Sequence, residues 1–236
     1  MISLLESREI IASLSRDDIF GTRIYADFLS GSAELTWWDN ENLLISFKRG
    51  VMTLCGAISG KDELMEFVSV ISPQAIMCHL ETAESLGLSV VQSGVIMAKS
   101  SEGDSIPLEG YYPDVHFSEY HQLLERCDMA PDYAGFCLET SRSLKTGTGI
   151  LLEHREENRL ISALVATSVT YDSAIINAVA VDPEYRRKGL GRKLLHDAEA
   201  TLPGRLLYIM REENKNEEFY RSCGYENIGH WCVAQI

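Results

Sequence analysis

A cluster of basic side chains and glycines stands between residues 186 and 193 of the chain. Its members are Arg186, Arg187, Lys188, Gly189, Gly191, Arg192 and Lys193. The cluster follows a β-branched run that ends at Asp182-Pro183, because proline cannot continue a central strand. It precedes residues 190–201, whose apolar side chains recur at helical spacing. Unpaired N–H groups and the positive end of a helix dipole would make this loop an anion site.

The positive charge of this cluster contrasts with the acidic character of the rest of the chain. The sequence carries 35 acidic and 21 basic residues and a formal net charge of −14. The alternative is a solvated basic turn that leads into a surface helix. Two other phosphate loops do not fit: GxxxxGK[ST] is absent, and in GxGxxG the last glycine would stand where the sequence has Leu194.

A second motif, Phe219-Tyr-Arg-Ser-Cys-Gly-Tyr225, follows Gly191 by about one helix and one strand. This part of the chain resembles the GNAT acyltransferase superfamily. The resemblance rests on a strand followed by Asp-Pro-x-Tyr, on Arg-x-x-Gly-x-Gly before an amphipathic helix, and on this second motif. The resemblance covers roughly residues 111–236. It implies an α/β fold in which a mixed sheet is flanked by helices, and it implies acetyl-CoA as the cosubstrate.

The resemblance also implies a role for individual residues. The backbone of Val179, Ala180 and Val181 would pair with the pantetheine arm like an added strand. The remaining cofactor-binding residues would be Arg186, Arg187, Lys188, Gly189, Leu190, Gly191, Arg192 and Asn216. The backbone N–H groups from 187 to 192 would hold the pyrophosphate, and an N–H near Val179 would stabilise an oxyanion. Tyr220 would protonate the departing thiolate.

Two departures from the family pattern remain. Glu213 stands where a pantetheine-binding asparagine is often found, and Asn214 or Asn216 could replace it after a small shift. No general base can be assigned, because Asn177 stands on the third strand where a carboxylate sometimes serves. The six histidines show no HxxxH or HExxH spacing, so no metal site is expected.

The elements of the second half are expected in the order ααβββαβαβ. Helices are expected at 118–129, 132–144, 190–201 and 216–223, and strands at 149–154, 160–170, 174–181, 205–210 and 228–236. This order predicts a layered α/β fold with helices against a sheet.

The first half shows a hairpin at 43–57, a helix after Ser59, strands at 75–80 and 90–98, and a short helix between them. Residues 99–110 are rich in Gly and Ser and predict a linker. We therefore predict a smaller α+β domain at 1–106 and a GNAT acetyltransferase domain at 107–236. The first domain resembles the later part of the second in its element order. It is a degenerate GNAT-like half that completes the substrate cleft, a separate recognition domain, or a surface for a homodimer.

The acidic surface disfavours nucleic acid and membrane partners and suits a cationic amine. No signal peptide is expected at residues 1–20, and the six cysteines lack CxxC spacing, which predicts a cytoplasmic protein. The expected function is N-acetyl transfer from acetyl-CoA to a primary amine of a small molecule, peptide or protein. The alternative is a non-catalytic acyl-CoA-binding regulatory protein.

Overall fold

The computed structural model describes residues 1–111 and 115–236. Its strands form one sheet in the order β1-β2-β3-β4-β5-β11-β6-β10-β9-β8-β7. The strands are β1 (Ser3–Leu4), β2 (Leu35–Trp38), β3 (Leu44–Lys48), β4 (Val51–Cys55), β5 (Ala75–His79), β6 (Ser89–Ser100), β7 (Ile150–Glu156), β8 (Arg159–Val169), β9 (Ser173–Val181), β10 (Leu206–Glu212) and β11 (Glu226–Gln235). The mixed α/β architecture expected from the sequence is confirmed.

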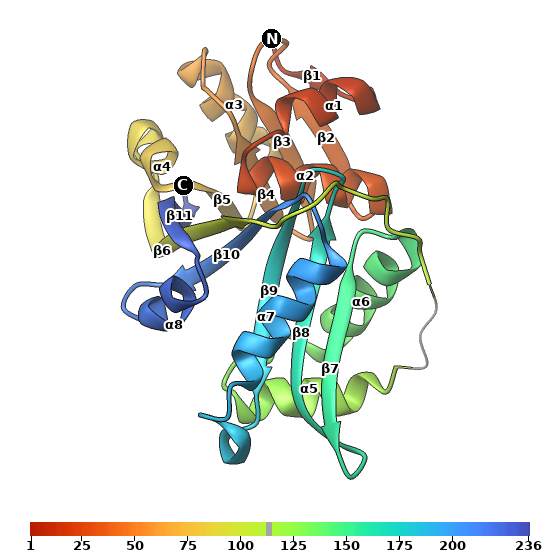
Figure 1. Ribbon diagram of the computed structural model, residues 1–236. Helices are drawn as coiled ribbons and strands as arrows, with labels where there is room; N and C mark the ends of the chain where they lie inside the picture. Colours follow the sequence, from red (N-terminus) through yellow and green to blue (C-terminus); the bar gives the residue numbers. More distant parts are fainter. Residues whose placement is uncertain (112–114) are drawn as a thin grey trace.

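Helices cover both faces of the sheet (Figure 1). The face that we call the first carries α1 (Arg8–Leu14), α2 (Ile19–Ser30), α5 (Phe117–Arg126) and α6 (Tyr133–Thr146). The second face carries α3 (Lys61–Ile71), α4 (Leu80–Leu86), α7 (Leu190–Thr201) and α8 (Glu217–Ser222), with the short 3-10 helix η1 (Pro183–Tyr185) before α7. Alternate strand residues point to opposite faces, so β9 buries Ile175 against α2 and Ile176 against α7.

Local signals set the ends of the helices on the first face. Asp18 caps α2 by accepting hydrogen bonds from the N–H groups of Phe20 and Gly21, and α2 ends at Gly31 with φ of +65°. Asp132 caps α6 through the N–H of Gly135, and α6 ends at Gly147 with φ of +69°. The elements α1, α2, β1 and β2 were not expected from the sequence, although Asp18 and Gly31 mark both ends of α2.

The chain repeats one order of elements. If the short strand β1 is set aside, the order in the first half is α1-α2-β2-β3-β4-α3-β5-α4-β6. The order in the second half is α5-α6-β7-β8-β9-α7-β10-α8-β11. In each half one pair of strands is parallel, β4 with β5 and β9 with β10, and a helix joins them. The first half therefore has the element order of a complete second copy.

The two halves exchange their last strands. β6 of the first half pairs with β10 of the second, and β11 of the second pairs with β5 of the first. β6 and β11 also pair with each other at the centre of the sheet. The two halves therefore share one sheet, and a boundary at residues 106 and 107 stays a prediction.

Residues 101–110 run along the end of this sheet. The buried guanidinium of Arg205 donates from Nε to the carbonyl of Thr170 at 2.8 Å and from Nη2 to the carbonyl of Ile106. Ser101 donates its hydroxyl proton to the carbonyl of Leu202 at 2.6 Å. The connection between the halves is thus tied to the start of β10. Among the described residues, none lies in a helix with the length and apolar character needed to cross a bilayer.

Candidate active site

β9 and β10 separate halfway along their length. They pair from Ser173 with Leu206 to Ile176 with Ile209, and β9 then continues to Val181 without a described partner on that side. The peptide groups of residues 177–181 therefore border a gap between two parallel strands. Val179, Ala180 and Val181, the residues expected to bind the pantetheine arm, lie along this gap. The carbonyl of Val181 already accepts from Arg186 Nε at 3.2 Å and from Cys127 Sγ at 3.3 Å.

Solvent reaches the first face of the sheet beside this gap. After its exposed first residue β8 is buried except for the half-buried Thr167, whereas in β9 Asn177 is exposed and three of the four residues that follow it are half-buried. Met210 is also half-buried within the otherwise buried middle of β10. Since the pairing of β9 with β10 ends just before Asn177 and Met210, these three side chains lie at the point where the strands part. The gap is therefore open to solvent at this point.

A buried carboxylate fixes the loop that follows β9. Asp182 is 1% exposed and accepts hydrogen bonds from Arg126 Nε at 3.0 Å and Arg159 Nη2 at 2.9 Å. The N–H of Glu184 donates to its other oxygen at 3.2 Å. Although burial alone would raise it, the Glu184 N–H and the two guanidinium groups hold the pKa of Asp182 below its usual value. The sequence analysis missed this anchor, because Arg126 and Arg159 are far from Asp182 along the chain.

The same two arginines line a small hollow of about 210 Å³ between α5 and the turn before β8. Its other lining residues are Glu119, Gln122, Asn158 and Leu160. Because Arg126 and Arg159 are both engaged by Asp182, this hollow supports the loop rather than adding a free basic site.

The loop then presents a row of unpaired donors. Within the described part of the chain, the N–H groups of residues 187 to 192 have no hydrogen-bond acceptor, and the first N–H of α7 to bond within the protein is that of Lys193, to Gly189. Gly189 has φ of +80° and Arg187 has φ of +64°, the left-handed conformations that turn successive N–H groups to one side. Such a nest at a helix N-terminus fits the pyrophosphate of an acyl-CoA.

The cations of this loop lie at its surface. Arg186, Arg187, Lys188 and Arg192 are all exposed. Lys188 places its ammonium 4.6 Å from the ring centre of Tyr185, and Arg192 Nη2 donates to Ser222 Oγ at 3.1 Å. The loop thus gathers positive charge around the unpaired N–H groups, and the second contact ties the start of α7 to α8.

Close packing joins the start of α7 to α8. A Cβ added at Gly191 would lie 3.1 Å from Phe219 Cζ and 3.8 Å from Val181 Cγ2. Gly191 therefore lets α7, α8 and the end of β9 converge at one place. Leu190, the first residue of α7, is half-buried beside it.

Tyr220 lies in this region, on α8. It is 9% exposed, and its ring packs with the core residues under α7 and near Phe219 and Tyr225. Burial raises the pKa of Tyr220 to about 12. Its hydroxyl has no described hydrogen-bond partner and, unlike the sealed hydroxyls of Tyr208 and Tyr225, it is not closed off from solvent. The phenol therefore stays protonated in the neutral range, and its contact with a ligand stays a prediction.

The residues before α8 are exposed and locally strained. Asn216 has φ of +59°, and its side chain makes no cap bond to α8. Glu217 pairs with Arg211 at 2.8 Å and with Arg221 at 2.8 Å, which holds the first turn of α8 against β10. Asn216 is thus free for a ligand, and its contact with the pantetheine arm stays a prediction. Among the described residues, no three or more His, Cys, Asp or Glu side chains are grouped to hold a metal.

The corresponding gap of the first half is closed. There the start of α2 is buried, and Asp18 accepts from His79 Nε2 at 2.6 Å across the ends of β4 and β5. The loop from β4 to α3 is shorter, comprises residues 56–60 and has no basic side chain. In the second half the equivalent residues at the start of α6, Asp132 and Tyr133, are exposed. Among the described residues, only the second half therefore combines an open gap with a loop of unpaired N–H groups.

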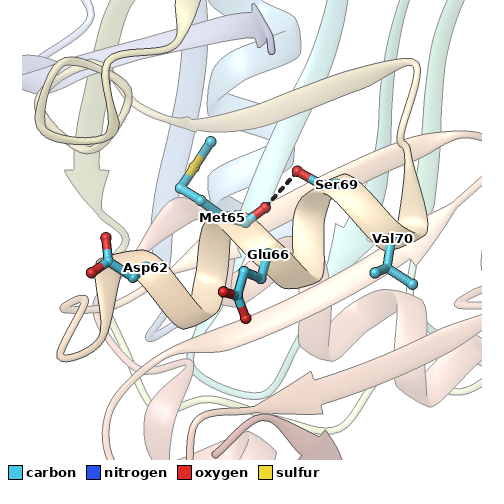
Figure 2. Close-up of a pocket in the computed structure, with 5 residues that line it drawn as sticks. All are labelled: Asp62, Met65, Glu66, Ser69 and Val70. Carbon is cyan, nitrogen blue, oxygen red and sulfur yellow. Dashed lines mark hydrogen bonds between the residues drawn. The ribbon is translucent and has the colours of Figure 1, made fainter.

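A separate hollow lies on the outer side of α3 (Figure 2). It is lined by Asp62, Met65, Glu66, Ser69 and Val70. Two carboxylates and no basic side chain face it, so it offers nothing to a phosphate group. None of the residues predicted for the site contributes to it.

Residues 147–227 match the family model of the acetyltransferase (GNAT) domain. These residues form a GNAT domain. They include β9, the loop, α7 and α8, so the matched segment contains the gap and the unpaired N–H groups described above. Acyl transfer is the chemistry of this family. No curated protein matches the sequence.

Solved structures similar to the chain extend beyond the matched segment. A GCN5-related N-acetyltransferase from Kribbella flavida is 13% identical, with 90% of this chain and 92% of that chain covered and a TM-score of 0.61. One from Sphaerobacter thermophilus is 11% identical, with coverages of 99% and 94% and a TM-score of 0.55. A tandem GNAT protein from the clavulanic acid biosynthesis pathway is 11% identical, with coverages of 99% and 97% and a TM-score of 0.58. At these identities the likeness concerns the fold, and it includes the first half as well as the GNAT domain.

Proposed function

We propose that the protein is an N-acetyltransferase that moves the acetyl group of acetyl-CoA to a primary amine. The row of unpaired N–H groups at residues 187–192, next to the gap between β9 and β10, carries this proposal. The donors suit the pyrophosphate, and the edge of β9 from Val179 to Val181, which has no described strand partner on the β10 side, suits the pantetheine arm. The arm would then direct the thioester toward the place where the two strands part.

In the proposed reaction the neutral amine attacks the thioester carbonyl directly. The new C–N bond forms as the C–S bond breaks, the amine loses a proton to solvent, and Tyr220 gives its proton to the departing sulfur. The solvent-reachable hydroxyl of Tyr220 and its raised pKa support this role, because the phenol stays protonated throughout the neutral range. Asn216 would contact the arm from the other side of the gap.

The net charge of −14 supports an acceptor that carries positive charge in solution. An acidic protein attracts such an amine over a distance of about one Debye length, roughly 8–10 Å at physiological salt. We place the reaction in the cytoplasm, in keeping with six free cysteines.

One observation favours a second candidate, a non-catalytic acyl-CoA-binding regulator. Asn177, the exposed residue at the parting of the strands, cannot act as a base. A regulator would bind acetyl-CoA but would release no thiol when an amine is supplied.

A thermal-shift titration followed by a thiol-release assay tests the proposal. Acetyl-CoA at a hundred times its dissociation constant should stabilise the protein by about 2.7 kcal/mol. Gly189→Glu should abolish this effect, since its carboxylate would stand among the N–H groups, while Glu66→Gln on α3 should retain it. Diamines, arylalkylamines and basic peptides then serve as acceptors for CoA release. Stabilisation without release from any amine would support the regulator, and no stabilisation at all would refute the proposal.

A further inference from the structure

Two buried cysteines face one another where the two halves of the chain join. Cys78 on β5 and Cys232 on β11 are direct partners in the antiparallel pairing of these strands. Their sulfur atoms lie 3.8 Å apart, and both side chains are fully buried. Since β5 belongs to the first half and β11 is the last strand of the second, this pair spans the place where a strand has been exchanged.

The backbone at this position already has the spacing that a disulfide needs. Residues directly opposite one another in an antiparallel pair have Cα atoms about 4.5–5.5 Å apart. A disulfide joins residues whose Cα atoms are about 4.4–6.8 Å apart, with a sulfur–sulfur bond of about 2.05 Å. Closure of Cys78 and Cys232 therefore requires rotation of two side chains and a small backbone adjustment, while the strands keep their register.

The helix α4 covers the two sulfur atoms. It follows β5 directly and packs against both β5 and β11 (Figure 1). Ala83 and Leu86 of α4 lie in the same buried cluster as the two cysteines. The helix has only seven residues, and His79 at its N-cap makes no side-chain cap bond. A helix of this length has little stability of its own, so we expect α4 to open more easily than the sheet beneath it.

Burial slows any reaction of these thiols in the closed protein. It raises the pKa of both Cys78 and Cys232, and the thiolate is the form that attacks a disulfide. Glu84 on α4 adds a negative charge that also raises the pKa of Cys232. Opening of α4 would bring water to the sulfur atoms and remove both effects. The pair is therefore expected to react only when this helix has opened.

We propose that Cys78 and Cys232 form a redox lock, in which a disulfide fastens β11 of the second half to β5 of the first. The oxidant is a low-molecular-weight disulfide such as oxidised glutathione. One cysteine thiolate attacks this disulfide and displaces one small thiol, and the other cysteine then attacks the mixed disulfide and displaces the second. The chain gives up two electrons and two protons, and the oxidant becomes two thiols. The lock does not depend on acyl transfer.

The lock acts on the exchange of strands between the halves. Its two cysteines stand 154 positions apart in the sequence, so the bond closes a long loop. A bond that closes a long loop restricts the unfolded chain more than one that closes a short loop. With the bond formed, β11 cannot leave β5, and the two halves stay joined when other contacts of the sheet open.

Oxidation of the unaltered, folded protein tests the lock. The protein is incubated with oxidised glutathione, the remaining thiols are alkylated, and mass spectrometry of the digest locates the bond. We expect Cys78 linked to Cys232, unfolding in urea slowed at least about tenfold, and reversal of both changes by dithiothreitol. Cys78→Ala should form no such bond, and its unfolding rate should not respond to the oxidant.

A second pair of variants tests whether α4 controls access. Leu86→Ala removes a buried contact of α4 and should speed bond formation at least about tenfold. Leu138→Ala makes the same substitution at an exposed position of α6 and should leave the rate unchanged. Equal rates in these two variants would overturn the part of the proposal that assigns access to α4.

Two further results would overturn the lock itself. One is recovery of Cys78 and Cys232 as alkylated free thiols after the half-buried Cys127, Cys137 and Cys223 have reacted. The other is bond formation no faster than global unfolding, because the pair would then be inaccessible in the folded protein. Cys55→Ala removes a different buried thiol and should retain both the bond and the slower unfolding.

Discussion

Tyr220 differs from Tyr208 and Tyr225, two other buried tyrosines, in the exposure of its hydroxyl. The hydroxyls of Tyr208 and Tyr225 are sealed without a hydrogen-bond partner in the described structure, whereas that of Tyr220 is not sealed. All three pKa values are raised by burial. Burial thus keeps each of the three phenols protonated, and the partial exposure of Tyr220 agrees with its proposed role as the proton donor.

Replacement of Tyr220 by phenylalanine should lower turnover much more than affinity. Phenylalanine keeps the ring contacts with Phe219 and Tyr225 and removes only the proton donor. Loss of a general acid typically costs about 10²–10⁴ in rate, so thiol release should fall by at least about a hundredfold. Calorimetry should find acetyl-CoA affinity within about twofold of the original, given the small energy of one lost hydrogen bond. Tyr225→Phe is the matched control and should retain turnover; equal losses of rate and affinity in Tyr220→Phe would contradict the acid role.

The raised pKa of Tyr220 predicts the alkaline side of the pH profile. An ordinary phenol, of pKa about 10, would lose the reactive proton from about pH 9 upward. Because burial raises the pKa of Tyr220 to about 12, its proton is still present there. The rate constant kcat should therefore rise as the amine deprotonates and should show no descending limb below about pH 10. A descending limb near pH 9 that disappears in Tyr220→Phe would show that the pKa is not raised.

At the scale of elements, the site depends on how closely α7 approaches α8. Gly191→Ala places a methyl group 3.1 Å from Phe219 Cζ, tighter than ordinary contact, so the Phe219 ring on α8 must shift. Such overpacking costs about 1–3 kcal/mol, and it should weaken acetyl-CoA binding about tenfold by displacing the N–H groups of α7. A smaller side chain at position 219 leaves room for the methyl group. The double variant Gly191→Ala with Phe219→Leu should therefore bind acetyl-CoA nearly as tightly as Phe219→Leu alone. Absence of recovery would show that the methyl group obstructs the ligand itself.

A second element-scale contact ties α2 to β5 through Asp18 and His79. Although burial alone would lower it, the hydrogen bond and charge of Asp18 raise the pKa of His79. A raised histidine pKa contributes stability that is present below about pH 6.5 and is lost as the pH rises through the folded value. The pKa of Asp18 is lowered despite its burial, so its contribution is lost only in acid. The ion pair therefore contributes most between these limits.

Removal of the histidine charge should therefore matter more at low pH than at high pH. His79→Gln should lower the free energy of unfolding more at about pH 5.5 than at about pH 9, because only the protonated imidazole is stabilised by Asp18. Urea unfolding at the two pH values measures the difference. Replacement of the exposed His196 by glutamine is the control, and an equal loss at both pH values in His79→Gln would show that the charge of His79 contributes nothing.

Local sequence patterns predicted most helices and strands of the second half. They did not predict contacts between residues that are far apart in the sequence. The loop at 186–191 and the Tyr220 motif could be predicted because each is a short run of residues next to the strand or helix that positions it. The Asp182 anchor could not, since Arg126 lies 56 positions away and a charge pair leaves no periodic pattern. Asn177 was noted for its place on a strand, but its hydrogen bonds with Thr167 depend on the register between β8 and β9, which the alternation of apolar residues does not give.

For the whole molecule, exchange of the last strands makes each half depend on the other. Without residues 1–106, β10 and β11 would lose β6 from between them, and β10 would expose an unpaired edge beside an apolar face. Residues 107–236 contain the GNAT domain and all the predicted site residues, yet they lack a strand of its sheet. We therefore expect the two halves, which share one sheet, to unfold as a single cooperative unit.

Cutting the chain between residues 106 and 107 tests this dependence and the predicted boundary together. Each fragment alone should give a circular-dichroism spectrum with little cooperative melting, because its exchanged strand has no partner. An equimolar mixture should regain one cooperative transition and acetyl-CoA binding, since β6 can return to its place between β10 and β11. A mixture that carries Gly94→Val in the first fragment should not recover, because a side chain there would meet the carbonyl of Arg211 at 2.1 Å. If residues 107–236 melt cooperatively and bind acetyl-CoA by themselves, the GNAT domain is autonomous, and the strand exchange only joins two halves that fold independently.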